Sequence, residues 1–124
     1  MDRVVSIKAT RLKLTEELES YVMKKLSGLE KLINAYNKNA RVFVEVARTT
    51  RHHKTGSIYY AEVQVMPPGS KMGLRAVAEK NSLYEAIDRA KDELKGELQK
   101  EKEKRITNVH KGGEKIKKEM RSVR

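Results

Sequence analysis

The chain has 124 residues, with 28 Lys+Arg against 17 Asp+Glu and no cysteine, so its formal net charge is +11 at pH 7. This length fits a single domain, and the lack of cysteine excludes a disulfide framework and a thiolate metal site. No apolar run approaches the roughly 20 residues of a membrane span, and no signal peptide is recognisable. We therefore expect a cytoplasmic protein, and the positive charge favours a polyanionic partner, nucleic acid first.

The positive charge divides the chain into two parts. Residues 105–124 carry a net charge of +5, which leaves +6 on residues 1–104. The last segment contains Gly112-Gly113 and few large apolar residues, so burial would not offset the entropy lost on ordering it. We predict a folded domain over 1–104 and a basic tail over 105–124 that is disordered or transiently helical when free.

The first third of the chain predicts a strand followed by a long helix. Val5, Ile7 and Ala9 alternate with polar residues, which is typical of a strand with one buried face. Thr15 precedes three glutamates, a composition that suits the N-terminus of a helix. Apolar residues then recur every three or four positions as far as Tyr36. This spacing predicts a single helix from about Thr15 to Tyr36.

Three more strands follow in the predicted order. Apolar and polar residues alternate over 41–46, and the segment 49–56 (TTRHHKTG) is interpreted as a polar loop. A further strand is expected over 57–66, and it ends at the PPGS turn because proline cannot extend a hydrogen-bonded ladder. Alternating apolar residues from Met72 to Ala78 predict the fourth strand.

A second helix is predicted from the capping box Ser82-Leu83-Tyr84-Glu85 to about Lys104. The resulting order is β-α-β-β-β-α. The first β-α-β unit favours a parallel pair of strands, and the short connections that follow favour antiparallel hairpins. We therefore predict an α+β fold, with a four-stranded mixed sheet and two helices on one face.

Lysines border the apolar stripes of both predicted helices. At about 100° per residue, three lysines of the last helix fall on one flank of its apolar stripe. On the first helix, two lysines lie seven residues apart and a third lies within the apolar stripe. If the two helices are neighbours, they would line a groove in which the lysines bind a phosphate backbone as point charges. A solvated face is the plain alternative, because acidic residues are interspersed, and Lys25 would then snorkel. The lysines concerned are Lys24, Lys25, Lys31, Lys91, Lys95 and Lys102.

Residues suited to catalysis or metal binding are sparse. His52 and His53 are adjacent and His110 lies in the tail, so no metal-ligand spacing occurs. The segment 51–54 (RHHK) is better interpreted as a basic loop tip. No nucleophile is spaced with a base, so we expect no enzyme, no cofactor and no small-molecule substrate.

The segment 81–88 (NSLYEAID), with Leu94 and Leu98 behind it, resembles the D-x-Y-x-A-I-D signature of the ribosome hibernation-promoting factor family, also called ribosome-associated inhibitor or ribosomal subunit interface protein. Residues 14–29 are similar to the first helix of that family, and residues 62–69 (EVQVMPPG) to its third strand and turn. The resemblance covers about residues 3–104 and has the same order of elements.

The resemblance implies a translation inhibitor without catalytic activity. Members bind the small ribosomal subunit between its head and body, contact ribosomal RNA where tRNA and messenger RNA would lie, and idle ribosomes under stress. Longer members add a dimerising domain, for which 105–124 is too short, so we expect a monomer when free and no membrane partner. The positions that match the family's basic residues are Lys25, Lys80, Arg89, Lys91 and Lys95. The chain departs from the family's pattern at Ser82, Glu93 and Gly96.

Two other functions stay open on the sequence alone. The order α-β-β-β-α after the first strand matches double-stranded-RNA-binding domains, which would bind bare RNA duplexes. A third possibility is an interaction protein whose exposed sheet face, with Phe43, Ile58 and Tyr60, docks an acidic partner.

Overall fold

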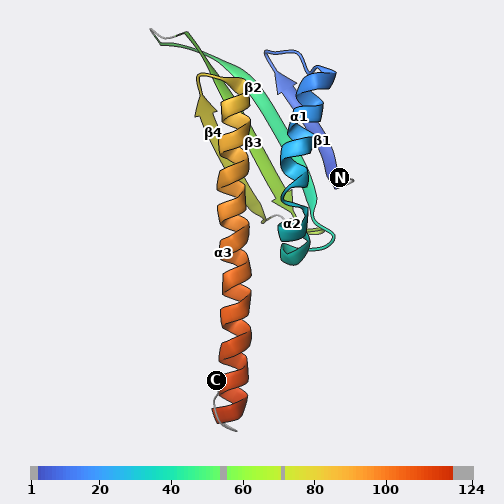
Figure 1. Ribbon diagram of the computed structural model, residues 1–124, viewed down its shortest axis with the longest axis vertical. Coiled ribbons are helices and arrows are strands. Elements are labelled where there is room, and N and C mark those ends of the chain that lie inside the picture. The colour runs from blue at the N-terminus through green and yellow to red at the C-terminus, as the bar shows by residue number, and fades with distance from the viewer. Residues whose placement is uncertain (1–2, 54–55, 71, 119–124) are drawn as a thin grey trace.

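The structure, a computed structural model, describes residues 3–53, 56–70 and 72–118, and their side chains over 3–49, 58–70 and 72–104. The elements run in the order β-α-α-β-β-β-α (Figure 1), which confirms the predicted α+β class. They are β1 (Val4–Thr10), α1 (Glu16–Ser27), α2 (Glu30–Tyr36), β2 (Arg41–His53), β3 (Gly56–Met66), β4 (Leu74–Lys80) and α3 (Leu83–Lys118).

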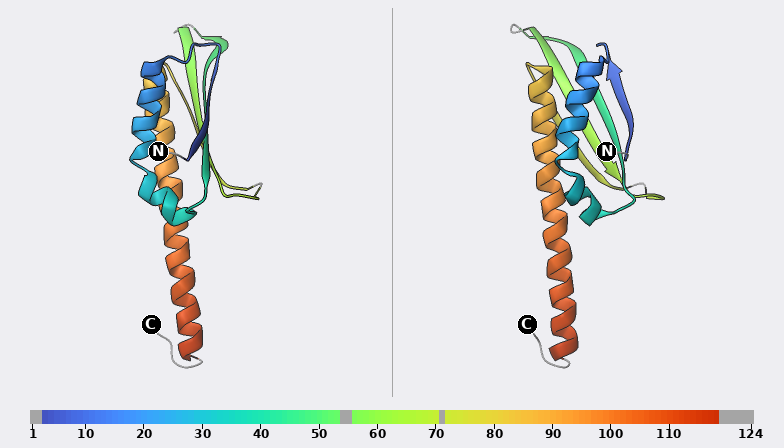
Figure 2. Two further views of the ribbon diagram at one scale, coloured as in Figure 1. Left: turned by 90° about the vertical axis from the view of Figure 1, so that its right-hand side faces the viewer. Right: turned by 45° about the vertical axis from the view of Figure 1, so that its right-hand side comes forward.

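The four strands form one mixed sheet in the order β1-β2-β3-β4. As predicted, β1 runs parallel to β2, while the β2–β3 and β3–β4 pairs are antiparallel. All three helices cover the same face of the sheet, and Figure 2 shows the other face without a covering layer. The sheet thus has a helical side and an open side.

The core lies between the sheet and the helices. Thr15 caps α1 as predicted, because its hydroxyl accepts a hydrogen bond from the Leu18 N–H at 3.1 Å. The predicted apolar stripes are buried on both the N-terminal helices and α3. They pack against alternating residues of β2, β3 and β4. The largest fully buried side chains are Leu26, Leu29, Ile33, Leu94, Leu98, Val22, Val42, Val46 and Val65.

The single helix predicted over 15–36 is two helices, with a break at Gly28 and Leu29. The Ser27 hydroxyl donates to the Lys24 carbonyl at 2.8 Å, and the Leu29 N–H bonds the carbonyl of Leu26, three residues back. Glycine is a weak helix former, and a hydroxyl bonded to the preceding turn favours bending. The break redirects the chain while keeping Leu29 buried.

The prediction that Val5 is buried is wrong, because Val5 is 53% exposed. The pairing of β1 with β2 shifts register between Val4 and Ser6. This irregularity reverses the alternation at the start of the strand, so that Val4 packs against the core in its place. Ile7 and Ala9 pack against the core as expected.

The β2–β3 hairpin is longer than predicted. Residues 49–53, interpreted as loop, belong to β2, and the ladder pairs Thr49 with Ile58 and, past an irregularity, His53 with Gly56. Threonine is β-branched and favours strands, but the polar composition of the segment 49–56 led to its interpretation as a loop. The side chains of the basic segment 51–54 lie outside the described residues.

Met72 lies outside β4, in contrast to the prediction, and is 81% exposed. The Ser70 hydroxyl accepts from the Met72 N–H and donates to the Met72 carbonyl, which holds the residue in the turn. A Cβ atom on Gly73 would lie 2.2 Å from the Val65 carbonyl oxygen. Only glycine therefore allows the chain to return so close to β3.

Helix α3 continues to Lys118, past the end predicted near Lys104. Figures 1 and 2 show that this last part extends well beyond the sheet and the other helices. The division into a domain over 1–104 and a tail over 105–124 stays a prediction.

Candidate nucleic-acid interface

Helices α1 and α3 lie side by side on the sheet (Figure 1). Two tyrosines make a contact between them. The rings of Tyr21 and Tyr84 are edge-to-face, with centroids 4.6 Å apart and planes at 87°. Such aromatic pairs contribute stability beyond the area they bury. The contact brings residues 63 positions apart to one place and fixes how the two helices face each other.

Asp88 links the same two helices by polar contacts. Its Oδ1 atom accepts a hydrogen bond from the Tyr21 hydroxyl at 2.6 Å and lies 3.3 Å from the Lys25 ammonium nitrogen. That nitrogen also lies 5.3 Å from the centre of the Tyr21 ring, a cation–π distance. We call Tyr21, Lys25, Tyr84 and Asp88 the helix junction.

Tyr21 and Lys25 of the junction keep their protons at neutral pH. The hydrogen bond to Asp88 raises the pKa of the Tyr21 hydroxyl, and burial adds to the rise, so the phenol stays protonated. The bond to Asp88 likewise raises the pKa of Lys25, so the ammonium stays charged. The cation predicted to matter most on the first helix is therefore held beside a fixed anion.

Lys91 and Lys95 extend the junction along α3. They follow Asp88 by three and seven residues, and this spacing places them on the same flank of the helix as Tyr84 and Asp88. The Lys91 side chain is 25% exposed and its nitrogen lies 3.6 Å from an Asp92 oxygen, while Lys95 is exposed. The flank that faces α1 therefore carries the cations that the periodicity predicted.

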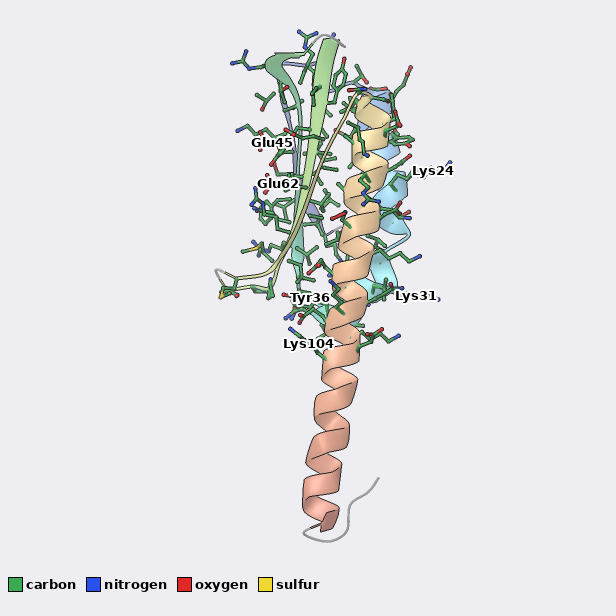
Figure 3. All side chains as sticks on the ribbon, turned by 90° about the vertical axis from the view of Figure 1, so that its left-hand side faces the viewer. Lys24, Lys31, Tyr36, Glu45, Glu62 and Lys104 are labelled. Carbon is green, nitrogen blue, oxygen red and sulfur yellow. The ribbon has the colours of Figure 1, made fainter. Side chains whose placement is uncertain are left out.

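Lys24 and Lys31 lie on the outer surface of α1 and α2. Both are exposed, and Figure 3 shows them on the helical side of the molecule, directed away from the sheet. Lys102 is exposed on α3, eleven residues after Lys91, which keeps it near the same flank. The helical side thus combines the cations of all three helices.

The structure does not bring Arg89 and Lys80 into this group. Arg89 comes one residue after Asp88, about 100° further around α3, and pairs with Glu93 at 3.3 Å on the exposed surface. Lys80 is exposed at the end of β4, where it pairs with Tyr59 across the sheet. Any RNA contact by these two would use a different part of the surface.

The spacing of the sequence does not predict the contacts of Asp88, because its charged neighbours along α3 are Arg89 and Lys91. Its partners are Lys25 and Tyr21 on the other helix. Spacing along one helix favours near neighbours and carries no information on contacts between helices. The only signal available was that Tyr84 and Asp88 belong to the same short motif.

The open side of the sheet has a different chemistry. Glu45 and Glu62 face each other across β2 and β3, and Figure 3 shows them on the side away from the helices. Glu62 accepts hydrogen bonds from Tyr60 at 2.6 Å, from Gln64 at 3.1 Å and from Arg75. Burial alone would raise the pKa of Glu62, but these bonds outweigh it and lower the pKa. Glu62 therefore stays ionised and paired with Arg75 on this face, where Lys8 also lies.

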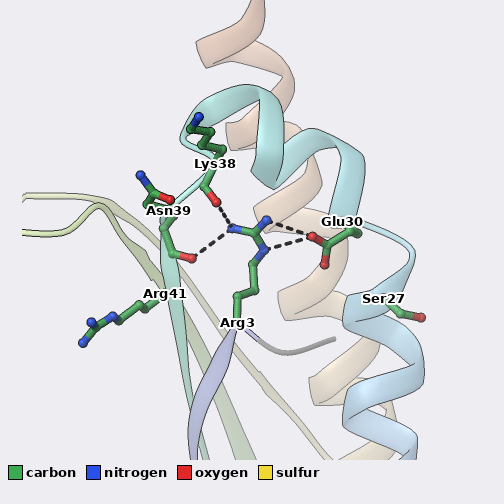
Figure 4. Close-up of a pocket in the computed structure, with 7 residues that line it drawn as sticks. Arg3, Ser27, Glu30, Lys38, Asn39 and Arg41 are labelled. Carbon is green, nitrogen blue, oxygen red and sulfur yellow. Dashed lines mark hydrogen bonds and ion pairs between the residues drawn. The ribbon is translucent and has the colours of Figure 1, made fainter.

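A hollow of about 650 Å³ lies at the opposite end of the helical layer from the β2–β3 turn. Arg3 spans it, as Figure 4 shows: its guanidinium bonds Glu30 at 2.8 Å and the Ala40 carbonyl at 3.0 Å. It also bonds the Lys38 carbonyl and the Asn34 side chain. Because these donors are already used, Arg3 ties the start of β1 to α2 and to the α2–β2 connection.

Replacing Arg3 with alanine is expected to lower the free energy of unfolding by about 1–2 kcal/mol, since the charged bonds are lost and Glu30 is partly screened by solvent. Urea unfolding followed by circular dichroism measures this change. Arg3→Lys keeps the charge without the planar fork and should recover less than half of the loss. A variant as stable as the parent chain would contradict the clamp.

No helix within the described residues is long and apolar enough to cross a membrane. Over the same part of the chain, no three His, Cys, Asp or Glu side chains gather as metal ligands would.

Comparison with known proteins gives a family and a fold. Residues 5–106 match the family model described as sigma 54 modulation protein / S30EA ribosomal protein. Among solved structures, the N-terminal domain of Thermus thermophilus Protein Y is 28% identical, with a TM-score of 0.58, and the match covers 79% of this chain and 97% of that domain. A ribosomal subunit interface protein from Coxiella burnetii is 19% identical, with a TM-score of 0.53 and coverage of 77% and 96%, and shows the same fold. No curated protein sequence matches.

The family match runs from residue 5, in β1, to residue 106, in α3, and so includes all four strands of the sheet. It includes the motif of residues 81–88 on which the resemblance was based, and so confirms that resemblance. The chain belongs to the sigma 54 modulation protein / S30EA ribosomal protein family, a family of ribosome-associated factors.

Proposed function

We propose that this protein inhibits translation by occupying the decoding channel of the small ribosomal subunit, where its helical side contacts ribosomal RNA. The observation that carries the proposal is the row of lysines on the flank of α3 that carries Tyr84 and Asp88. Lys91, Lys95 and Lys102 follow one another along this flank, and Lys25 of α1 lies beside its start. A polyanion can follow such a row through several phosphates, which would orient the molecule on it.

Occupancy alone would account for inhibition. Lysines contact phosphates as point charges, which supplies affinity and orientation with little reading of base sequence. The packed α/β body then excludes tRNA and messenger RNA from the volume it fills. The mechanism needs no catalytic group, no cofactor and no second copy of the chain, and the partner is the small subunit with its ribosomal RNA.

Co-sedimentation with ribosomes at increasing salt tests the proposal. We expect the protein to migrate with small subunits at low salt and to be released steeply as salt rises, because several phosphate contacts each displace counterions. Added messenger RNA and tRNA should compete with it for the subunit. Binding that is unaffected by these competitors would contradict occupancy of the decoding channel.

Binding to a bare RNA duplex distinguishes the proposed function from that of a double-stranded-RNA-binding module. A double-stranded-RNA-binding module would bind such a duplex as tightly as it binds ribosomes. We expect much weaker binding to the duplex, because only the ribosome offers a surface that engages all three helices at once. Equal affinity for the two would favour the rival.

A further inference from the structure

We infer that Asp88 is a specificity-determining residue: its carboxylate competes with phosphate for Lys25 and thereby weakens binding to RNA other than the ribosomal site. The inference rests on the proposed function and names a residue that discriminates between RNA partners. It starts from the helix junction, where the Asp88 carboxylate contacts Lys25 and is followed along α3 by Lys91 and Lys95.

The geometry holds the anion in place. Asp88 is on α3, and the same oxygen atom contacts Lys25 at 3.3 Å and the Tyr21 hydroxyl at 2.6 Å, both on α1. The edge-to-face contact of Tyr21 with Tyr84 fixes the spacing of the two helices. The carboxylate therefore has little freedom to move away when a phosphate approaches.

The surroundings make this anion costly for an incoming polyanion. Lys91 and Lys95 lie along the same flank, so a backbone that follows them passes close to Asp88. With the Asp88 and Lys25 side chains 43% and 35% exposed, solvent and a ligand reach both groups. A phosphate at Lys25 must displace Asp88 or lie beside it, and like charges at short distance repel.

The same carboxylate also orients the lysine. Asp88 and the Tyr21 ring together restrict where the Lys25 ammonium points. An RNA surface that makes many contacts at once gains from a lysine that is already oriented. A flexible single strand that binds through a few phosphates is mainly repelled by the Asp88 carboxylate. Building an unfavourable element against wrong partners is a general route to specificity.

Asp88→Asn tests the inference, because the amide keeps an oxygen that accepts from Tyr21 while the charge is removed. We expect the affinity for a bare single-stranded RNA to rise about three- to fivefold, and the logarithmic salt dependence to steepen by about 0.7, one phosphate contact. Affinity for ribosomes should stay level or fall. Thermal unfolding of the full-length variant checks that the fold is retained.

Glu45→Gln is the matched control. It changes the net charge equally but lies on the open side of the sheet, where its carboxylate accepts from Thr10 at 3.1 Å. An equal gain in RNA affinity for both variants would overturn the inference, since net charge would then explain it. An equal gain for ribosomes and bare RNA in Asp88→Asn would overturn it as well. If the unmodified protein fails to bind ribosomes, the proposed function itself fails, a result distinct from both.

Discussion

Reversing the charge at both Lys91 and Lys95 to glutamate is expected to weaken ribosome binding by about 100-fold. Each charged contact with phosphate contributes about 1.5 kcal/mol, and two lost contacts give a change of that size. Both residues lie on the flank of α3 that carries Tyr84 and Asp88, so the new carboxylates would join Asp88 in one acidic stripe. Fluorescence titration of labelled protein with small subunits measures the change. The slope of log affinity against log salt concentration should become less steep, by the amount expected for about two phosphate contacts.

Stability should change little, because Lys95 is exposed and Lys91 keeps a quarter of its side chain in solvent. The control is Lys13→Glu with Arg41→Glu, two exposed residues outside the three helices that give the same change of net charge. We expect a loss of less than about tenfold for the control, from general electrostatics alone. Equal losses in the two double variants would show that the position of the lysines does not matter.

Leu94→Ala is expected to destabilise the fold by roughly 2–5 kcal/mol, the range for truncating a fully buried leucine. Leu94 is 0% exposed and packs in the core shared by α3 and the sheet, so the side chain leaves a cavity when removed. For a domain near 100 residues, the melting temperature should fall by at least about 8 °C. Differential scanning calorimetry measures it.

The effect on ribosome binding should follow the folded population alone. Below its melting temperature the Leu94→Ala variant is expected to bind as the parent chain does, since Leu94 contributes no surface to the helical side. Met72→Ala is the control: this residue is 81% exposed, so the change should stay within about 0.5 kcal/mol. A leucine variant that loses binding while still folded would mean that the core and the interface are coupled.

Local patterns were enough to predict the fold class, the strand pairing and most of the core. The stripe from Leu18 to Ile33 follows helical spacing, and it is buried even though the helix breaks at Gly28. Periodicity reports which residues face the core, and the core face is continuous across the break. It does not report a change of axis, which depends on how the chain packs against the sheet.

Two of the errors, the burial of Val5 and the loop over 49–53, share one physical cause. Val5 fits the alternation along the strand, but the shift of register in β1 exposes it, and such a shift depends on the partner strand. The ladder that draws residues 49–53 into β2 also depends on pairing with β3. Side chains were assigned to faces by counting along one segment, which leaves out contacts with the next segment.

The candidate site was predictable only in part. Spacing placed Lys91 and Lys95 on one flank of α3, as the structure has them. It gave no reason to place Asp88 against Lys25, since 63 residues separate the two positions and only the packing of α1 on α3 brings them together. Long-range polar contacts of this kind are therefore where the structure adds most.

The length of α3 has a consequence for how its last part holds together. Residues 105–118 extend about 20 Å at the usual rise per residue, and they include the Gly112-Gly113 pair, which disfavours helix. An isolated peptide of this composition would rarely start a helix, because nucleation is costly. In this chain the turns of α3 before Leu98 are already helical and packed against the body, so the residues that follow only have to propagate the helix. The overhang should therefore fray from its far end inward, and melting of the body would remove its helicity at the same time.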